Sequence, residues 1–194
     1  MTVRLKLVCH AATAATRAAA FPDDEPLEPQ ARQKLAEYAL PLREASRCWT
    51  SPARRAVQTA QFLKLAAAVE PGLADCDYGR WTGRTLEAVQ AEEPDAVAQW
   101  LADPAAAPHG GEPLLALLAR VAGWMDAQRR APGRVVAVTH ASVVKAAILH
   151  ALGAPPPSFW RIDVAPLTLA RLTGDKARWT LASLGPLPAR RRLA

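Results

Sequence analysis

The sequence predicts an α/β sandwich around a largely parallel sheet, and three observations carry this prediction. Short apolar segments of strand length alternate with longer segments of helical spacing along the 194 residues. Two of the strand-like segments, "KLVCH" and "VVAVTH", end on a histidine, His10 and His140. A third, "RCWTS", leads directly into a helical segment. We expect ligand-binding chemistry at one edge of the sheet, because open α/β sheets bind ligands outside the carboxyl ends of their strands.

The first half of the chain supplies two of the expected strands and two helices. Val3–Val8 has an apolar core and ends in a polar loop, which is typical of a central strand. Glu28–Ala45 has helical spacing until Pro41 interrupts it. Arg47–Ser51 is a short strand, and Pro52 stands where a helix can begin. The segment "ARRAVQTAQFLKLAAA" is expected to continue that helix.

The second half repeats the alternation and closes with strand-like segments. Gly111–Ala131 is predicted to be a long amphipathic helix, and Arg134–His140 a β-branched strand. The helix "ASVVKAAILHALG" follows, with Gly153 as its stop signal. The segments "FWRIDVA", "TLARLT" and "RWTLASL" are predicted strands. We expect a single domain over residues 1–186, followed by a basic, solvated C-terminal tail at 187–194.

Composition and charge indicate the class of protein. The length fits one ordinary globular domain with a full core. The formal net charge of +6 favours acidic ligands, although a composition dominated by arginine and alanine would give the same value. Three cysteines without metal-type spacing argue for a reducing compartment. Without a membrane-length apolar run or a recognisable signal peptide, we expect a cytoplasmic protein with no membrane partner. A nucleic-acid partner is not expected, because no reading module or interleaved aromatic pattern occurs.

The strand ends and one helix start predict a phosphate site. A single histidine at a strand end is usually structural, but His10 and His140 are each followed by small residues that keep the edge open. The segment "SPARRA" brings Arg54 and Arg55 to the same edge, in the first turn of a helix. The free N–H groups of a helix start favour anions. Two imidazoles and a guanidinium converging on a helix N-terminus suit a phosphoryl group.

The order of these motifs resembles that of the histidine phosphatase superfamily, which includes the cofactor-dependent phosphoglycerate mutases. The family's Arg-His-Gly appears here as Cys9-His10-Ala11, and Thr13 matches the threonine or serine two positions further on. "SPARRAVQTA" matches the family's "SpxxRAxxTA". "LADCDYGRWTG" matches "LxExxxGxWxG", with Asp75 at the glutamate position. A "GGE" follows, and "VAVTHAS" stands for "VVTHGG", so the matches keep the family order over nearly the whole chain.

The resemblance implies a three-layer α/β/α sandwich and a phosphomonoester hydrolase. His10 would be the nucleophile that forms a phosphohistidine. Arg55 and His140, with Thr13, would hold the phosphoryl oxygens. Asp75 would protonate the departing alkoxide and then help water to attack. The ligand would be a phosphorylated small molecule or inorganic phosphate, with no metal or cofactor. A mutase is less expected, because the chain lacks the long insertions of that branch.

Several positions depart from the family pattern. Cys9 cannot supply the bidentate, charged fork of an arginine. Losing one such donor pair costs about 2–4 kcal/mol of transition-state stabilisation, which is about a hundredfold to a thousandfold in rate. Arg17 is the predicted substitute if its loop folds over the site, with Arg54 second. Ala11 and Ala141 replace glycines and tighten the site slightly.

Other interpretations remain open from the sequence. The rival function is a noncatalytic protein that binds a phosphorylated ligand or a partner on the same fold. Cys9 is a poor candidate for the nucleophile, because seven residues separate it from Arg17 where cysteine-dependent phosphatases have five. A metal site of Cys9 with the two histidines is disfavoured, because adjacent residues of a strand point to opposite faces.

Glu112 is the second candidate for the acid, and His109 is expected at the surface or on a helix face. Trp160 is expected to pack or to line the pocket. The oligomeric state is open, with a homodimer as one option.

Overall fold

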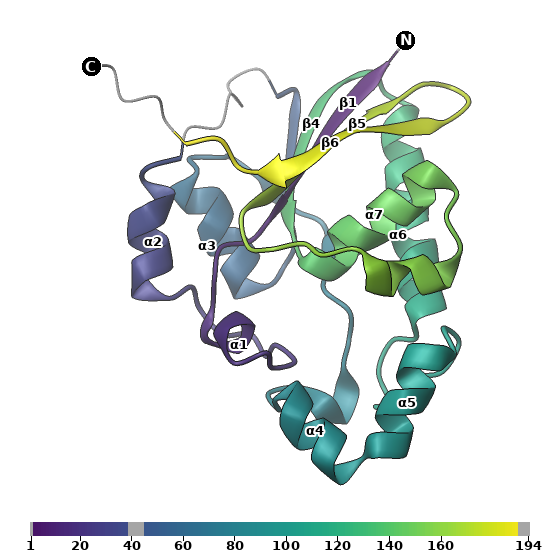
Figure 1. The fold of residues 1–194 in the computed structure, drawn as a ribbon. Helices are drawn as coiled ribbons and strands as arrows, with labels where there is room; N and C mark the ends of the chain where they lie inside the picture. The colour runs from purple at the N-terminus through teal and green to yellow at the C-terminus, as the bar shows by residue number, and fades with distance from the viewer. Residues whose placement is uncertain (1, 39–44, 190–194) are drawn as a thin grey trace.

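A computed structural model describes residues 2–38 and 45–189 of the chain (Figure 1). Its sheet has six strands in the order β3-β2-β4-β1-β5-β6. The strands are β1 (Val3–Cys9), β2 (Arg47–Thr50), β3 (Ala68–Val69), β4 (Gly133–Thr139), β5 (Thr168–Gly174) and β6 (Trp179–Pro186). Strands β1 to β4 are parallel to one another, and β5 and β6 join antiparallel beside β1. The predicted, mostly parallel sheet is confirmed.

Helices connect and cover the strands. The α-helices are α1 (Ala14–Arg17), α2 (Pro29–Leu35), α3 (Arg54–Phe62), α4 (Leu86–Glu92), α5 (Pro94–Ala102), α6 (Leu114–Arg129) and α7 (Ala141–Leu152). Short 3₁₀ helices are η1 (Pro71–Leu73), η2 (Gly79–Trp81) and η3 (Pro156–Arg161). Figure 1 shows α2 and α3 on one side of the sheet and α6 and α7 on the other. Helices α4 and α5 lie together beyond the end of the sheet to which β1 leads.

The central strands are buried on both faces, as parallel strands between helix layers must be. Leu5 and Leu7 of β1 pack with α6 and α7 in the largest core cluster. Val8 points to the opposite face and packs with Ala56 and Ala60 of α3. The alternation along one strand therefore builds two cores, and the predicted three-layer sandwich is confirmed.

Strand register brings the two histidines to the same place. Cys9 of β1 pairs with Thr139 of β4 in a parallel ladder, so the next residue of each strand is a histidine. The His10 N–H donates to the Thr139 carbonyl oxygen at 2.8 Å, which extends the ladder by one bond. Neighbouring parallel strands thus deliver both imidazoles to one edge of the sheet.

The predicted helices end earlier than expected in two places. Helix α3 stops at Phe62 rather than running on to Ala68, because Lys64 takes a left-handed conformation with φ +57°. The Leu65 N–H then bonds the Ala60 carbonyl oxygen, which is the Schellman arrangement of a helix end. Ala68 belongs instead to the edge strand β3. The helix expected over Glu28–Ala45 is α2, which ends at Leu35; residues 36–38 are not helical, and Pro41 lies outside the described residues.

Other expectations need correction. The predicted strand "FWRIDVA" is wrong, because Pro155–Pro157 favours a turn of 3₁₀ helix and Phe159 is buried within η3. His109 is buried rather than at the surface, with its ring 5.1 Å from that of Trp81. Packing also continues past residue 186, since Leu187 is buried and donates its N–H to Leu167. The arginines at 190–192 lie outside the described residues. Of the helices in the described ranges, none has the length and hydropathy needed to cross a membrane.

Candidate active site

The two strand-end histidines face each other at the carboxyl edge of the sheet. The ring centroids of His10 and His140 are 5.2 Å apart and the planes meet at 64°. Both side chains are buried, with 5% and 1% of their residue surface exposed. This is the convergence of imidazoles that the sequence predicts.

The His10 ring is held in one tautomer. Its Nδ1 lies 2.8 Å from the carbonyl oxygen of Ala11, and a carbonyl can only accept. Nδ1 therefore carries the hydrogen, and Nε2 keeps its lone pair. Burial, together with the neighbouring His140, lowers the pKa of His10 to about 3. The ring is neutral at pH 7, with a nucleophilic Nε2.

The His140 ring has a polar neighbour on each side. Its Nε2 lies 2.6 Å from the Ser51 hydroxyl oxygen, and its Nδ1 lies 3.2 Å from an oxygen of Asp75. Ser51 is fully buried at the end of β2, where its N–H bonds the Val138 carbonyl oxygen. Ser51 belongs to the quoted "SPARRA" segment, but sequence reasoning assigned it no contact. The sequence did hold a signal for this contact, because Ser51 follows the third predicted strand just as the two histidines follow theirs.

Arg55 reaches the same place from the first turn of α3. Only 4% of its side chain is exposed. One terminal nitrogen donates to the Asp23 carbonyl oxygen at 2.8 Å, and the other donates to Asp75 at 2.7 Å. Its Nε is buried without a partner among the described residues. The predicted cation is therefore beside the imidazoles and has a donor to offer an incoming anion.

Asp75 joins these groups into one network. Besides Arg55 and His140, it accepts a 2.5 Å hydrogen bond from the Ser142 hydroxyl in the first turn of α7. Burial alone would raise the pKa of this carboxyl. The surrounding His140, Arg55 and Ser142 outweigh that effect and hold the pKa of Asp75 well below its usual range. In this state the expected proton donor is an ionised carboxylate that accepts hydrogen bonds from Arg55 and Ser142.

Arg120 of α6 positions the backbone that carries Asp75, and sequence reasoning missed it. Its guanidinium donates to the carbonyl oxygens of Gly72 and Ala74, both at 3.0 Å, and to that of Asp75 at 3.3 Å. It also binds both carboxylate oxygens of Glu112, at 3.0 and 2.7 Å. Glu112, the second candidate for the acid, is thus engaged by Arg120 and precedes α6 rather than lying in its first turn.

An acidic loop covers the start of α3. Asp24 accepts the backbone N–H of Arg54 at 2.7 Å, so one of the helix N–H groups expected to bind phosphate already holds a carboxylate. Both carboxylate oxygens of Glu25 are buried without a hydrogen-bond partner in the described part of the chain, and one lies 3.9 Å from Arg55. The run "PDDE" was the signal for this loop, but nothing in it indicates where the loop folds.

Two predicted phosphate ligands are engaged with their own neighbours instead. The buried Thr13 hydroxyl accepts the N–H of Thr16 and caps α1. Arg17 donates to both carboxylate oxygens of Glu28, at 3.0 and 2.6 Å, and 68% of its side chain is exposed. This arrangement does not support Arg17 as the substitute for the family's arginine. Arg54, the second choice, is exposed.

Cys9 lies in the hydrophobic core and not among the polar groups of the candidate site. It is almost fully buried among apolar side chains, and burial raises the pKa of its thiol to about 12. A neutral thiol of this kind is a poor nucleophile, which disfavours the cysteine-dependent alternative. Within residues 2–38 and 45–189, no group of three or more histidine, cysteine, aspartate or glutamate side chains is arranged to hold a metal ion.

Several known proteins are similar to this chain in sequence or in fold. The "Bifunctional protein Rv2228c" of Mycobacterium tuberculosis is 31% identical over 138 residues, which are 66% of this chain but only 37% of that protein. Among solved structures, "Mycobacterial hydrolase 1" is 25% identical with a TM-score of 0.81, over 98% of this chain and 100% of that one. The mycobacterial glucosyl-3-phosphoglycerate phosphatase Rv2419c, solved with VO3, is 25% identical with a TM-score of 0.81, over 92% and 96% of the two chains.

A family comparison covers nearly the whole chain. Residues 5–186 match the model of the histidine phosphatase superfamily, branch 1. The matched range begins in β1, ahead of His10, and runs to the last residue of β6. The chain therefore belongs to the histidine phosphatase superfamily.

Proposed function

We propose that the protein hydrolyses phosphate monoesters through a phosphohistidine formed on Nε2 of His10. The observation that carries this proposal is the His10 ring, which is neutral and oriented by Ala11, 5.2 Å from His140. The membership of the superfamily supports it, as does the similarity to Rv2419c, which is itself a phosphatase.

In the first step, the His10 Nε2 lone pair attacks phosphorus and the bond from phosphorus to the ester oxygen breaks. Arg55 and His140 donate to the nonbridging oxygens and balance the charge that develops on them. The departing alkoxide takes a proton from Asp75. Asp75 can carry that proton because a bound phosphate brings negative charge beside it and competes for Arg55 and His140, which raises the pKa of the carboxyl.

In the second step, water attacks the phosphohistidine. The Asp75 carboxylate accepts a proton from the water as the bond from phosphorus to Nε2 breaks. Inorganic phosphate leaves, and His10 returns to its neutral form with Nε2 free. The sum is one ester and one water converted to one alcohol and one phosphate.

The test is to trap the covalent intermediate. The protein would be incubated with a ³²P-labelled aryl phosphate and quenched, and acid-labile label on the chain would be measured. We expect label on wild type, none on His10→Ala, and wild-type label on His150→Ala. His150 is a matched control because its ring contacts Asp126 on α6 and lies outside the network described above.

The same experiment separates the enzyme from the noncatalytic alternative. The feature that favours a noncatalytic binding protein is Cys9, which stands at the family's arginine position and removes a charged donor from the site. Phosphate binding by calorimetry without label or product would support that alternative and would contradict the proposed hydrolase.

A further inference from the structure

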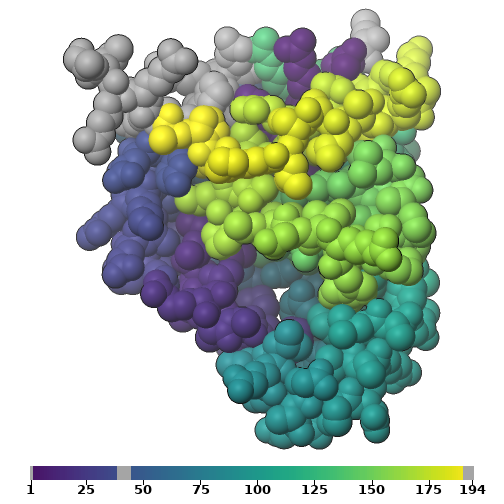
Figure 2. All heavy atoms as spheres, viewed as in Figure 1, coloured from purple at the N-terminus to yellow at the C-terminus, as the bar shows by residue number. Residues whose placement is uncertain are grey.

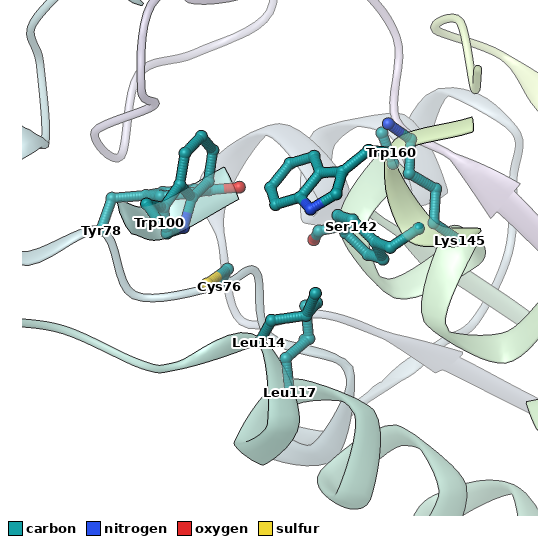
Figure 3. A pocket seen from close by; sticks show the side chains of 10 residues that line it. Cys76, Tyr78, Trp100, Leu114, Leu117, Ser142, Lys145 and Trp160 are labelled. Atoms are coloured by element: carbon teal, nitrogen blue, oxygen red, sulfur yellow. The ribbon is translucent and has the colours of Figure 1, made fainter. Parts of the chain in front are cut away.

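A cavity of about 140 Å³ lies next to the network around Asp75, where α5, α6, α7 and η3 meet (Figure 3). Its walls are mainly aromatic and aliphatic: Tyr78, Trp100, Leu114, Leu117, Phe159 and Trp160. The lining residues range from Cys76 to Trp160, and the space-filling view shows a hollow between the teal, yellow-green and purple segments (Figure 2). The walls thus come from segments far apart in the sequence.

The size and shape of this cavity suit one six-membered ring. The rings of Trp100 and Trp160 are 4.6 Å apart at 68°, and those of Phe159 and Trp160 are 5.0 Å apart at 83°. Edge-to-face packing is a preferred geometry of aromatic pairs, so these rings hold one another in place. An apolar cavity of about 150 Å³ is known to take up benzene, and this cavity is close to that volume.

The cavity opens beside the group that would protonate the leaving oxygen. Ser142 lines it and donates to Asp75 at 2.5 Å. Cys76 and Tyr78 line both this cavity and the neighbouring one, which contains Arg55 and Asp75. A phosphoryl group held by Arg55 would have its ester oxygen toward Asp75, and the rest of the alcohol would enter the aromatic cavity.

One of the residues that line this cavity, Lys145, is basic. Lys145 lies on α7 on the same side as Ser142, and its ammonium group is 5.3 Å from the centroid of the Phe159 ring (Figure 3). Burial lowers the pKa of Lys145, partly offset by Asp163. A positively charged leaving group would meet like charge here, which is a way of excluding a ligand.

We infer that this cavity receives the leaving group of the substrate, which is therefore a small phosphate monoester whose alcohol carries one six-membered ring and no positive charge. The inference rests on the proposed function, since it assigns the leaving-group side of the same site. It excludes small acyclic phosphates as preferred substrates.

The test compares benzyl phosphate with ethyl phosphate, because both are alkyl esters with similarly poor leaving groups. We expect kcat/KM about ten- to thirtyfold higher for benzyl phosphate, from burial of the ring. Trp160→Ala should reduce that preference to about threefold or less. Leu101→Ala is the matched control, since Leu101 is exposed on α5 next to Trp100 and should keep the wild-type preference.

A second pair of esters tests whether the leaving group must lack a positive charge. In wild type, 4-(aminomethyl)benzyl phosphate should have a kcat/KM at least about tenfold below that of benzyl phosphate. Lys145→Met should bring the two esters closer together. Equal rates for both esters in wild type would overturn this part of the inference.

Binding measurements distinguish an error in the cavity assignment from an error in the proposed function. Affinities of benzylphosphonate and ethylphosphonate would be measured by calorimetry, with Trp100→Leu as a second variant should Trp160→Ala fail to fold. Tighter binding of benzylphosphonate that is lost in the variants, without turnover of any ester, would refute the hydrolase but support the cavity. Equal turnover and equal binding of the benzyl and ethyl compounds would refute the cavity and leave the hydrolase standing.

Discussion

Replacing Asp75 by asparagine separates the two roles that the site gives this carboxylate. Asp75 accepts hydrogen bonds from Arg55 and Ser142 and lies 3.2 Å from His140. Asparagine keeps the size and an acceptor oxygen, but it has neither the charge nor a proton to donate. We expect slower release of poor leaving groups and, at the same time, tighter binding of inorganic phosphate.

The magnitudes follow from the contacts. General acid catalysis contributes about 10²- to 10⁴-fold, so kcat for an alkyl phosphate should fall by that factor. A unit negative charge about 5 Å from a bound anion opposes it by about 3 kcal/mol at an effective dielectric constant of about 20. Two features reduce the gain in phosphate affinity: Asp75 is 16% exposed, and it also helps to orient Arg55. We expect phosphate to bind about tenfold more tightly.

The assay compares 4-nitrophenyl phosphate with ethyl phosphate, and Asp77→Asn serves as the control. Nitrophenolate leaves without a proton, so its kcat should fall less than about tenfold in Asp75→Asn, while kcat for ethyl phosphate falls far more. Asp77 lies in the same loop and accepts the Gly79 N–H at 2.8 Å, outside the network around Asp75. Equal losses for both esters, with weaker phosphate inhibition, would show that Asp75 only holds Arg55 and His140.

Three further predictions concern stability and pH. Because burial lowers the pKa of His10 from 6.5 to about 3, the unfolded chain binds more protons between these values and stability falls as pH falls. Between about pH 6.5 and about pH 4, urea unfolding should show wild type losing about 3 kcal/mol more than His10→Gln; parallel curves would contradict this. Gly79 has φ +50°, and an added Cβ would lie 2.2 Å from a carbonyl oxygen. Gly79→Ala should therefore cost more than about 2 kcal/mol in the free energy of unfolding, whereas the helical Gly123→Ala, with open space around it, should cost nothing. Ser142→Ala removes a donor that lowers the pKa of Asp75, so the alkaline limb of the kcat profile should move to higher pH; an unmoved limb would argue against Asp75 as the acid.

The convergence of His10, Arg55 and His140 could be predicted because it follows from topology. Parallel strands joined by helices place their carboxyl ends on one edge, so the ends of β1, β2 and β4 had to meet. That rule alone brings His10, Arg55 and His140 together. The alternating burial of β1 likewise required helices on both faces, which is the sandwich that is observed.

The partners of individual side chains could not be predicted, because they depend on the paths of loops. Arg17 is near His10 in sequence, yet its loop places it against Glu28. Arg120 looks like any arginine of a long helix, but it holds the backbone of 72–75. Phe159 misled the strand prediction because an apolar run after prolines has the composition of a strand and the backbone of a 3₁₀ turn. Tertiary packing decides each of these cases.

Under the proposed function, charge balance would explain how the site binds phosphate although Cys9 stands where the family has an arginine. Two nitrogens of Arg55 and the start of α3 already bind Asp23, Asp75 and Asp24, so under the proposed function an anion would bind partly by exchange and partly through the unpaired Nε of Arg55. A dianionic phosphate would bring two charges to the guanidinium of Arg55, which Asp75 binds with one, and the displaced carboxylate would then gain a proton more readily. The same exchange therefore weakens phosphate binding and prepares the acid, which is why neutralising position 75 should tighten binding while it slows the reaction.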